Sequence, residues 1–167
     1  MNVLSRSPGQ VLAGLLLAAA IATVTHAADT AGGSLHYQGR SVAFKYAWLV
    51  TGPSELEAGK TVRRLVLSTT DLGATLQACK AFSCTDGTVM EGMTVDFTGG
   101  PRLNYWIVMN GQKIQYSGTA RPDAFAARAN DPGRLAGRLA IDDTAAGGPK
   151  LDAEFDVTLL KEFKVAR

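Results

Sequence analysis

The chain has 167 residues, 17 of which are Lys or Arg and 15 Asp or Glu, so its formal net charge is +2 at neutral pH. That length is sufficient for one domain with a hydrophobic core. Charges of the two signs are interspersed, without the basic blocks typical of nucleic-acid-binding proteins, and we therefore expect no nucleic-acid partner.

The first 27 residues have the pattern of a secretory signal peptide. Arg6 is their one charged residue, residues 11–24 form an apolar stretch, and Thr25-His26-Ala27 has the small-x-small pattern of a cleavage site. The apolar stretch is shorter than the roughly 20 residues of an ordinary membrane-spanning helix. We therefore expect a mature protein of residues 28–167, secreted or periplasmic and without a membrane span. An uncleaved membrane anchor is the alternative.

After this leader, the sequence predicts about eight strands separated by turns. A short strand is expected at 33–38, followed by one at 41–50 whose alternation of residue types predicts a single buried face. That face consists of Val42, Phe44, Tyr46, Trp48 and Val50. Further strands are expected at 61–69 and 87–97. Between them, the sequence favours one short helix near 71–79, which we expect to end close to Cys79.

The clearest hairpin covers residues 103–118. Its centre, Asn110-Gly111, is typical of a two-residue type I′ turn. Folding about this turn pairs Ile107 with Ile114. The same register leaves Trp106 on the more polar face of the hairpin, opposite the face that we expect to join the core.

A second hairpin is expected over residues 123–141. The apolar residues of the two strands fall on the same face only if residues 131–133 form a three-residue loop, which pairs Phe125 with Leu139. The last strand, 151–159, alternates apolar residues with Asp152, Glu154 and Asp156. Together these elements predict an all-β fold, a single-domain antiparallel β-sandwich, with an up-and-down barrel as the alternative.

Cys79 and Cys84 are the only cysteines of the chain. A zinc site needs four ligands, but His36 is the single histidine after the leader, and a thioredoxin-like redox site needs Cys-x-x-Cys. We therefore predict a disulfide, which the oxidising environment outside the cytoplasm favours. A disulfide tolerates Cα atoms up to about 7 Å apart, so residues 79–84 are expected to form a turn.

Two places are candidates for contact with a partner. The disulfide loop carries Lys80 and, at its tip, Phe82; packing of Phe82 onto the domain is the alternative. Trp106 is the second candidate, because an exposed tryptophan is a common binding hot spot. Cover by a loop or a second sheet, or packing on the Lys113 stem, is the alternative for Trp106.

No catalytic motif stands out. His36 lies in a strand without a Gly-x-Ser-x-Gly nucleophile motif. Asp152, Glu154 and Asp156 share one face of the last strand and are candidates for calcium binding or glycoside hydrolysis. Asp96 is a further candidate for the hydrolysis. Pairing of the acids of the last strand with Arg134 and Arg138 is the alternative. We expect no metal and no cofactor.

Several short motifs resemble those of small secreted bacterial all-β domains of unassigned function. The matching residues are Gly33, Leu35 and Gly39, then Tyr46-Ala47, Gly137-Arg138-Leu139 and Phe155-Asp156. They span most of residues 28–167. The resemblance implies an all-β fold and a location in the cell envelope, and it supplies no catalytic residues.

From these observations we expect a non-catalytic binding protein of the cell envelope: an adaptor, an inhibitor or an immunity-type protein whose partner is another envelope or secreted protein. A carboxylate-based hydrolase acting on cell-wall or glycan substrates and a carrier of a small apolar ligand are the alternatives. The hydrolase needs two of the acidic residues to converge in a cleft. The carrier needs an empty barrel interior.

Overall fold

The computed structural model describes residues 29–55, 57–98, 100–111 and 114–167. The predicted signal peptide, residues 1–27, lies outside these ranges. Within them, no helix is both long enough and apolar enough to cross a membrane.

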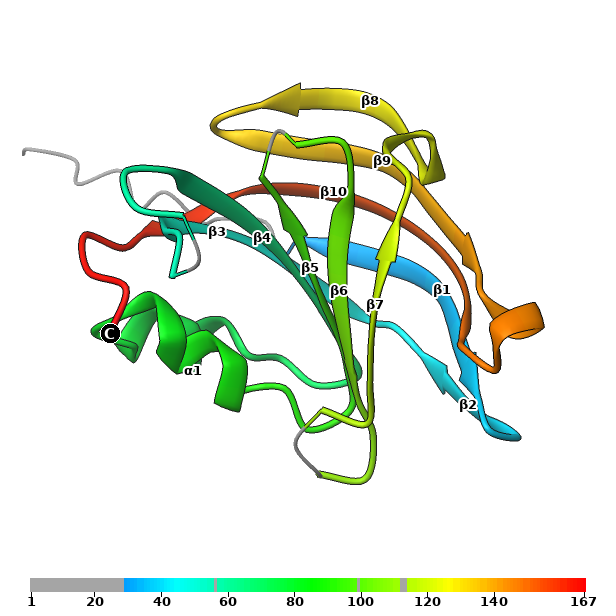
Figure 1. The fold of residues 1–167 in the computed structure, drawn as a ribbon. Coiled ribbons are helices and arrows are strands. Elements are labelled where there is room, and N and C mark those ends of the chain that lie inside the picture. The colour runs from blue at the N-terminus through cyan, green and yellow to red at the C-terminus, as the bar shows by residue number, and fades with distance from the viewer. Residues whose placement is uncertain (1–28, 56, 99, 112–113) are drawn as a thin grey trace, which may run out of the picture.

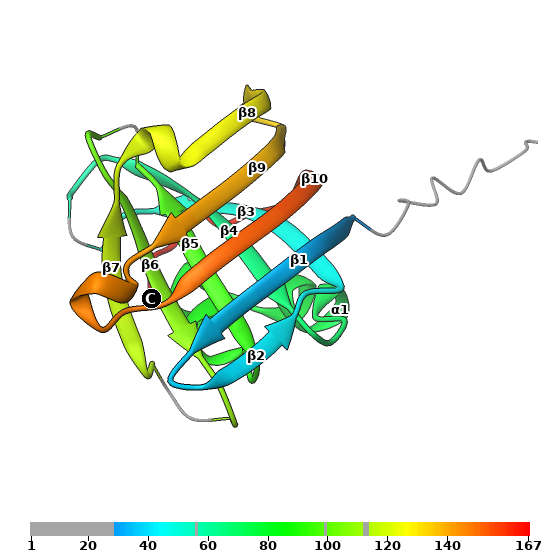
Figure 2. The ribbon, with the colours of Figure 1, turned by 90° about the vertical axis from the view of Figure 1, so that its right-hand side faces the viewer.

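The described part of the chain forms ten strands in one strongly curled sheet (Figures 1 and 2). The strands are β1 (Thr30–Tyr37), β2 (Arg40–Ala43), β3 (Tyr46–Pro53), β4 (Thr61–Ser68), β5 (Gly92–Phe97), β6 (Leu103–Val108), β7 (Tyr116–Ala120), β8 (Phe125–Asp131), β9 (Arg134–Asp142) and β10 (Lys150–Glu162). The helical elements are α1 (Gly73–Ala78) and short 3₁₀ helices at Phe82–Gly87, Pro122–Ala124 and Thr144–Ala146.

The strand order is β7-β6-β5-β4-β3-β1-β10-β9-β8, with β2 paired to β1. All described pairings are antiparallel except that of β3 with β10, which is parallel. The predictions of an all-β fold and of one short helix are confirmed. The two stacked sheets of the predicted sandwich are replaced by one continuous sheet, which curls far enough to enclose its own core.

The inner face of the curled sheet holds the main hydrophobic core. Strands from both halves of the sheet contribute to it, and many of its side chains are completely buried. Among the largest are Leu35, Leu65, Met93, Tyr105, Ile107, Leu139 and Phe155. Burial of this apolar surface is the main source of folding free energy. The inward residues of the last strand, Leu151 to Val157 in alternation, confirm the predicted phase of that strand.

The outer face of the sheet is partly covered as well. Helix α1 packs over it through Leu76, which joins a cluster with Trp48 and Val66. The 3₁₀ helix at Phe82–Gly87 packs beside α1, and Phe82 contacts the ring of Phe163. Strand β3 is therefore buried on both faces, and for this reason the predicted single buried face of residues 41–50 is wrong.

That prediction placed residues 41–50 in one strand with a single buried face. The strand is instead interrupted between β2 and β3, at residues 44–45, and it resumes in the opposite phase. Val42 and Phe44 lie in the inner core, whereas Trp48 and Val50 lie in the outer clusters. The inner positions of β3 are taken by Ala47 and Leu49.

The two predicted hairpins are present with altered registers. In the first, Ile107 pairs with Tyr116 rather than with Ile114, so the loop is longer than two residues, although Asn110 and Gly111 keep the positive φ of the predicted turn. A shift of two residues keeps the side chains of the paired strands on their predicted faces. Ile114 is the exception: it was predicted on the core face beside Ile107, but it lies in the loop, is exposed and lines the pocket on the outer face. The pairing predicted for residue 112 lies outside the described residues.

In the second hairpin, Phe125 pairs with Leu139 as predicted. An irregularity between Ala127 and Ala129 then shifts the register by one residue, so that Asp131 pairs directly with Arg134. The turn therefore contains two residues instead of three. A bulge of this kind absorbs one residue and increases the local twist.

The Cys79–Cys84 disulfide is present, with Cα atoms 5.7 Å apart. As predicted, the helix ends just before Cys79, and the bridge closes a turn. We expect the double variant Cys79→Ala/Cys84→Ala to lose about 2 kcal/mol of unfolding free energy, because the closed loop is short. Urea denaturation of the variant and of the oxidised parent measures this loss. A loss as large as that of a core truncation would contradict the local role of the bridge.

Candidate functional site

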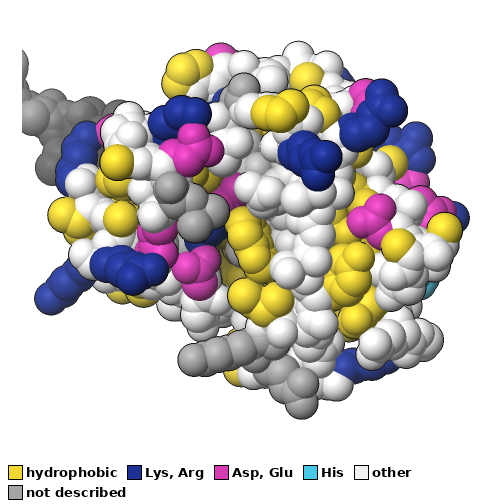
Figure 3. Space-filling model, viewed as in Figure 1, with side chains coloured by type: hydrophobic (Ala, Val, Ile, Leu, Met, Phe, Trp, Pro, Cys, Tyr) yellow, Lys and Arg dark blue, Asp and Glu magenta, His cyan; other side chains and the backbone are white. Residues whose placement is uncertain are grey.

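A pocket of about 270 Å³ opens on the outer face of the sheet. Strands β4, β5 and β6 form its floor, and the loop after β3 and the 3₁₀ helix at Phe82–Gly87 form its sides. Its lining residues are Ser54, Glu55, Glu57, Val62, Arg64, Phe82, Asp86, Val89, Thr94, Asp96, Thr98, Asn104, Trp106, Val108 and Ile114. Figure 3 shows acidic side chains beside hydrophobic ones on this face of the molecule.

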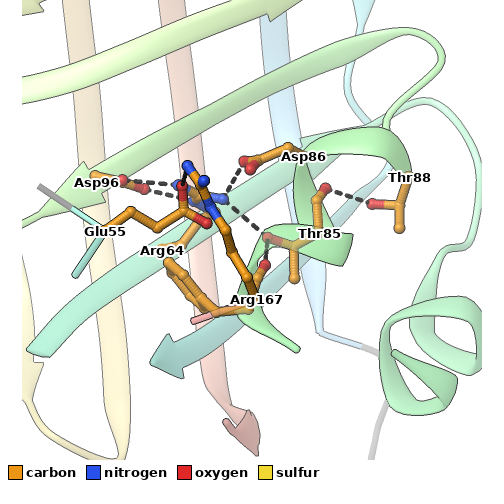
Figure 4. Close-up of polar contacts among 8 residues, drawn as sticks. Glu55, Arg64, Thr85, Asp86, Thr88, Asp96 and Arg167 are labelled. Atoms are coloured by element: carbon orange, nitrogen blue, oxygen red, sulfur yellow. Dashed lines mark hydrogen bonds and ion pairs between the residues drawn. The ribbon is translucent and has the colours of Figure 1, made fainter. Parts of the chain in front are cut away.

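Arg64 occupies the floor of the pocket (Figure 4). It projects from β4 directly opposite Asp96 of β5, and the side chains of both are 8 % exposed. Arg64 Nε and Nη2 donate to the two carboxylate oxygens of Asp96 at 2.6 and 2.9 Å. Its Nη1 donates to Thr85 Oγ1 at 2.9 Å and also to Asp86. Four of the five N–H groups of the guanidinium are thus engaged, and the side chain is fixed.

Two aromatic rings flank the same guanidinium. Its Cζ atom lies 4.5 Å from the ring centre of Phe82 and 5.6 Å from that of Trp106. Both distances are typical of cation–π contacts. Phe82 is itself held by the outer-face cluster, so the geometry of Arg64 is set by ion pairs and ring contacts together.

Carboxylates lie around the rim of the pocket. Glu55 accepts a hydrogen bond from Arg167 at 2.8 Å, and this contact lowers the pKa of Glu55. Glu57 pairs with Lys60. Asp86 behaves in the opposite way: burial raises its pKa, and the neighbouring carboxylates add to that rise although Arg64 opposes it.

The structure places the two predicted partner-contact sites, Trp106 and the disulfide loop, differently with respect to solvent. Trp106 lies on the outer face, half-buried, and lines the pocket. Lys80 is exposed on the disulfide loop. The exposed position predicted for Phe82 is wrong: its side chain is 2 % exposed, packs on Phe163 and forms part of the pocket wall. The alternative, packing of Phe82 onto the domain, describes the structure.

Sequence reasoning missed the central residue of the site, Arg64. It lies in the largely apolar stretch of β4, where a buried arginine is exceptional. A signal was present, because a charged residue in such a strand requires a partner of opposite charge. The partner, Asp96, could not be identified without the register of β4 against β5.

The acids of β10 do not join this pocket. Asp152 accepts a hydrogen bond from Arg138 at 2.8 Å, and Asp156 accepts two from Arg134 at 2.9 and 2.7 Å. These side chains are exposed, and the pairs are those that the sequence offered as the alternative to a catalytic role. Strand β10 is separated from β5, which carries Asp96, by β4 and β3.

Arg138 holds the pKa of Asp152 below its ordinary value, chiefly through a hydrogen bond. The ionised carboxylate therefore contributes stability above the unfolded-state pKa and loses that contribution as pH falls through the folded-state pKa. We expect Arg138→Ala to raise the pKa of Asp152 towards the ordinary value, as measured by carboxyl carbon NMR titration. Arg134→Ala is the matched control, and it should raise the pKa of Asp156 instead.

His36 is exposed on β1, where its Nε2 lies 3.0 Å from Ser34 Oγ. Within the described ranges, no group of three or more His, Cys, Asp or Glu side chains is placed to hold a metal ion. Comparison of the chain with protein-family models, with curated proteins and with solved structures gives no match.

Proposed function

We propose that this chain is a non-catalytic binding protein of the cell envelope, and that it binds its partner through the pocket lined by Arg64 and Trp106. One observation carries the proposal. A half-buried tryptophan lies beside an arginine that is already fixed by Asp96, Thr85 and Asp86, so the pocket is preorganised. Preorganised pockets with an aromatic wall and few polar groups are typical binding sites.

The chemistry of the pocket favours binding over catalysis. Arg64 uses its donors on protein groups, so its role is to maintain the shape and charge of the floor. The two alternatives gain less support. The interior in which a small apolar ligand could be carried holds the main core, and the β10 acids that a hydrolase would use are paired with arginines.

Export is part of the proposal. The signal-peptide pattern of residues 1–27 and the Cys79–Cys84 disulfide both support it. Expressed with its own leader, the full chain is expected in the periplasm or the medium, with Ala28 as its first residue. Fractionation and N-terminal sequencing measure this. Retention in the cytoplasm with residues 1–27 intact would contradict it.

Capture of envelope and secreted proteins by the exported chain tests the binding role. Trp106→Ala is expected to abolish capture of a specific partner, because tryptophans in pockets contribute a large share of interface free energy. Val165→Ala is the matched control, since Val165 is an exposed apolar residue outside the pocket lining. Equal capture by the parent and both variants would remove Trp106 and this pocket from the proposal.

A further inference from the structure

We infer that the pocket is a site for a cationic group on an aliphatic stem, an ammonium or a guanidinium, and that Arg167 of the chain itself occupies the place of that cation. This inference rests on the proposed function, because it takes the pocket to be the binding site. It adds the chemical class of the ligand and an internal competitor for it.

The first argument is charge. Among the residues that the structure describes, four carboxylates line the pocket, those of Glu55, Glu57, Asp86 and Asp96, against the single guanidinium of Arg64. Arg64 is shared between Asp96 and Asp86, which leaves one negative charge in excess. Glu57 is paired with Lys60, whereas Glu55 is paired with Arg167. When Arg167 leaves Glu55, a second negative charge becomes uncompensated.

The second argument is shape. Apolar side chains extend from the floor of the pocket to its mouth, and they are Val62, Val89, Trp106, Val108 and Ile114. Such a wall suits the methylene stem of a lysine-like or arginine-like group, which packs along apolar surface while its charged end stays at the rim. The rim carboxylates Glu55 and Asp86 are where that charged end would be received.

An anionic ligand fits less well. Four of the five N–H groups of Arg64 are already engaged, so little remains for an incoming anion. The neighbouring carboxylates would repel it. Burial is the main cause of the raised pKa of Asp86, and the charges of Asp96 and Glu55 add to it although Arg64 opposes them. A bound cation should lower the pKa of Asp86.

The third argument is the position of Arg167. Figure 4 shows its side chain reaching the region of Glu55 and Arg64 from the C-terminal segment. That segment is anchored independently, since the backbone N–H groups of Phe82 and Ser83 donate to Val165 and Ala166 at 3.0 and 2.9 Å. The Arg167 side chain is 80 % exposed. It can therefore leave Glu55 without detaching the segment.

The experiment titrates the exported chain with three probes of similar size: n-butylammonium, n-butanol and butyrate, at low salt. Binding is followed by the NMR signal of the Trp106 indole N–H. We expect n-butylammonium to bind about tenfold more tightly than n-butanol, butyrate to bind more weakly than either, and added salt to weaken the cation most. Binding of butyrate at least as tight as that of the cation would overturn the inference.

Variants locate the site. Glu55→Gln and Asp86→Asn should each weaken n-butylammonium binding about threefold or more, whereas Glu154→Gln on β10 is the matched control and should not. Arg167→Gln should tighten binding roughly threefold by removing an exposed competitor. Its control is Arg121→Gln, which alters an equally exposed arginine whose partner, Asp123, is not a pocket residue. Unchanged binding in Glu55→Gln, Asp86→Asn and Arg167→Gln would overturn the inference.

A further titration distinguishes two possible sources of the cation, a protein side chain and a small molecule. If a capped Ala-Lys-Ala tripeptide binds at least as tightly as n-butylammonium, the ligand is a side chain of a protein; if only the free amine binds, it is a small molecule. Both outcomes support the inference. Partner capture that depends on Trp106, combined with no preference for the cationic probe, would leave the proposed function standing and would refute the cationic ligand.

Discussion

Replacement of Arg64 by methionine is expected to lower the free energy of unfolding by about 3–5 kcal/mol. The substitution leaves the Asp96 carboxylate buried without the guanidinium that neutralises it and donates two hydrogen bonds to it. It also removes the cation between the rings of Phe82 and Trp106. Equilibrium denaturation in urea, followed by circular dichroism, measures the loss.

Arg134→Met provides the matched control, because Arg134 makes an equally well-aligned pair with Asp156 on an exposed face. Exposed ion pairs contribute little to the free energy of unfolding, so Arg134→Met should lower it far less than Arg64→Met does. The double variant Arg64→Met/Asp96→Leu should recover part of the loss, since it removes the orphaned charge as well. If Arg64→Met destabilised the protein no more than Arg134→Met, the burial of this pair would have no energetic role.

The substitution Gly33→Ala in β1 is the second change that we expect to lower the free energy of unfolding strongly. Gly33 has φ +116°, and a Cβ atom at this position would lie 2.1 Å from the backbone oxygen of Asp152 on β10. The substitution imposes backbone strain of about 1–3 kcal/mol and separates two strands that are paired along most of β1. Overpacking adds a cost of similar size. The free energy of unfolding should therefore fall by about 3–5 kcal/mol.

Gly32→Ala is the neighbouring control. A Cβ atom at Gly32 meets nothing within 4 Å, so that substitution should be nearly neutral. Thermal unfolding of the two variants side by side provides the comparison. Equal melting temperatures for both would mean that β1 and β10 separate at no cost, in contradiction to the close approach of their backbones at residues 33 and 152.

Several features of the fold could be predicted because they depend on local pattern. Alternation in residues 151–157 predicted which side chains enter the core, and the spacing of Cys79 and Cys84 predicted both the bridge and the end of the helix. Trp106 was correctly assigned to the face opposite the core, because a register shift of two residues preserves sidedness.

Other features depend on contacts that no local pattern contains. The phase change at residues 44–45 follows from the outer cover of β3 by helical segments, which buries Trp48 and Val50 on the side opposite to Val42. The Arg64–Asp96 pair depends on the register of two strands, and the Glu55–Arg167 pair joins segments more than 100 residues apart in sequence. The pocket is therefore a product of tertiary structure.

The pairing of β1 with β10 also has a consequence for the order of folding. The first strand of the described chain finds its main partner in the last one, and the parallel contact of β3 with β10 closes the sheet at the same late point. Loop closure over such separations is entropically costly and slow. The core therefore remains open until the C-terminal residues are available. A chain with an open core can still pass through a narrow channel, during synthesis and, if it is exported, during translocation.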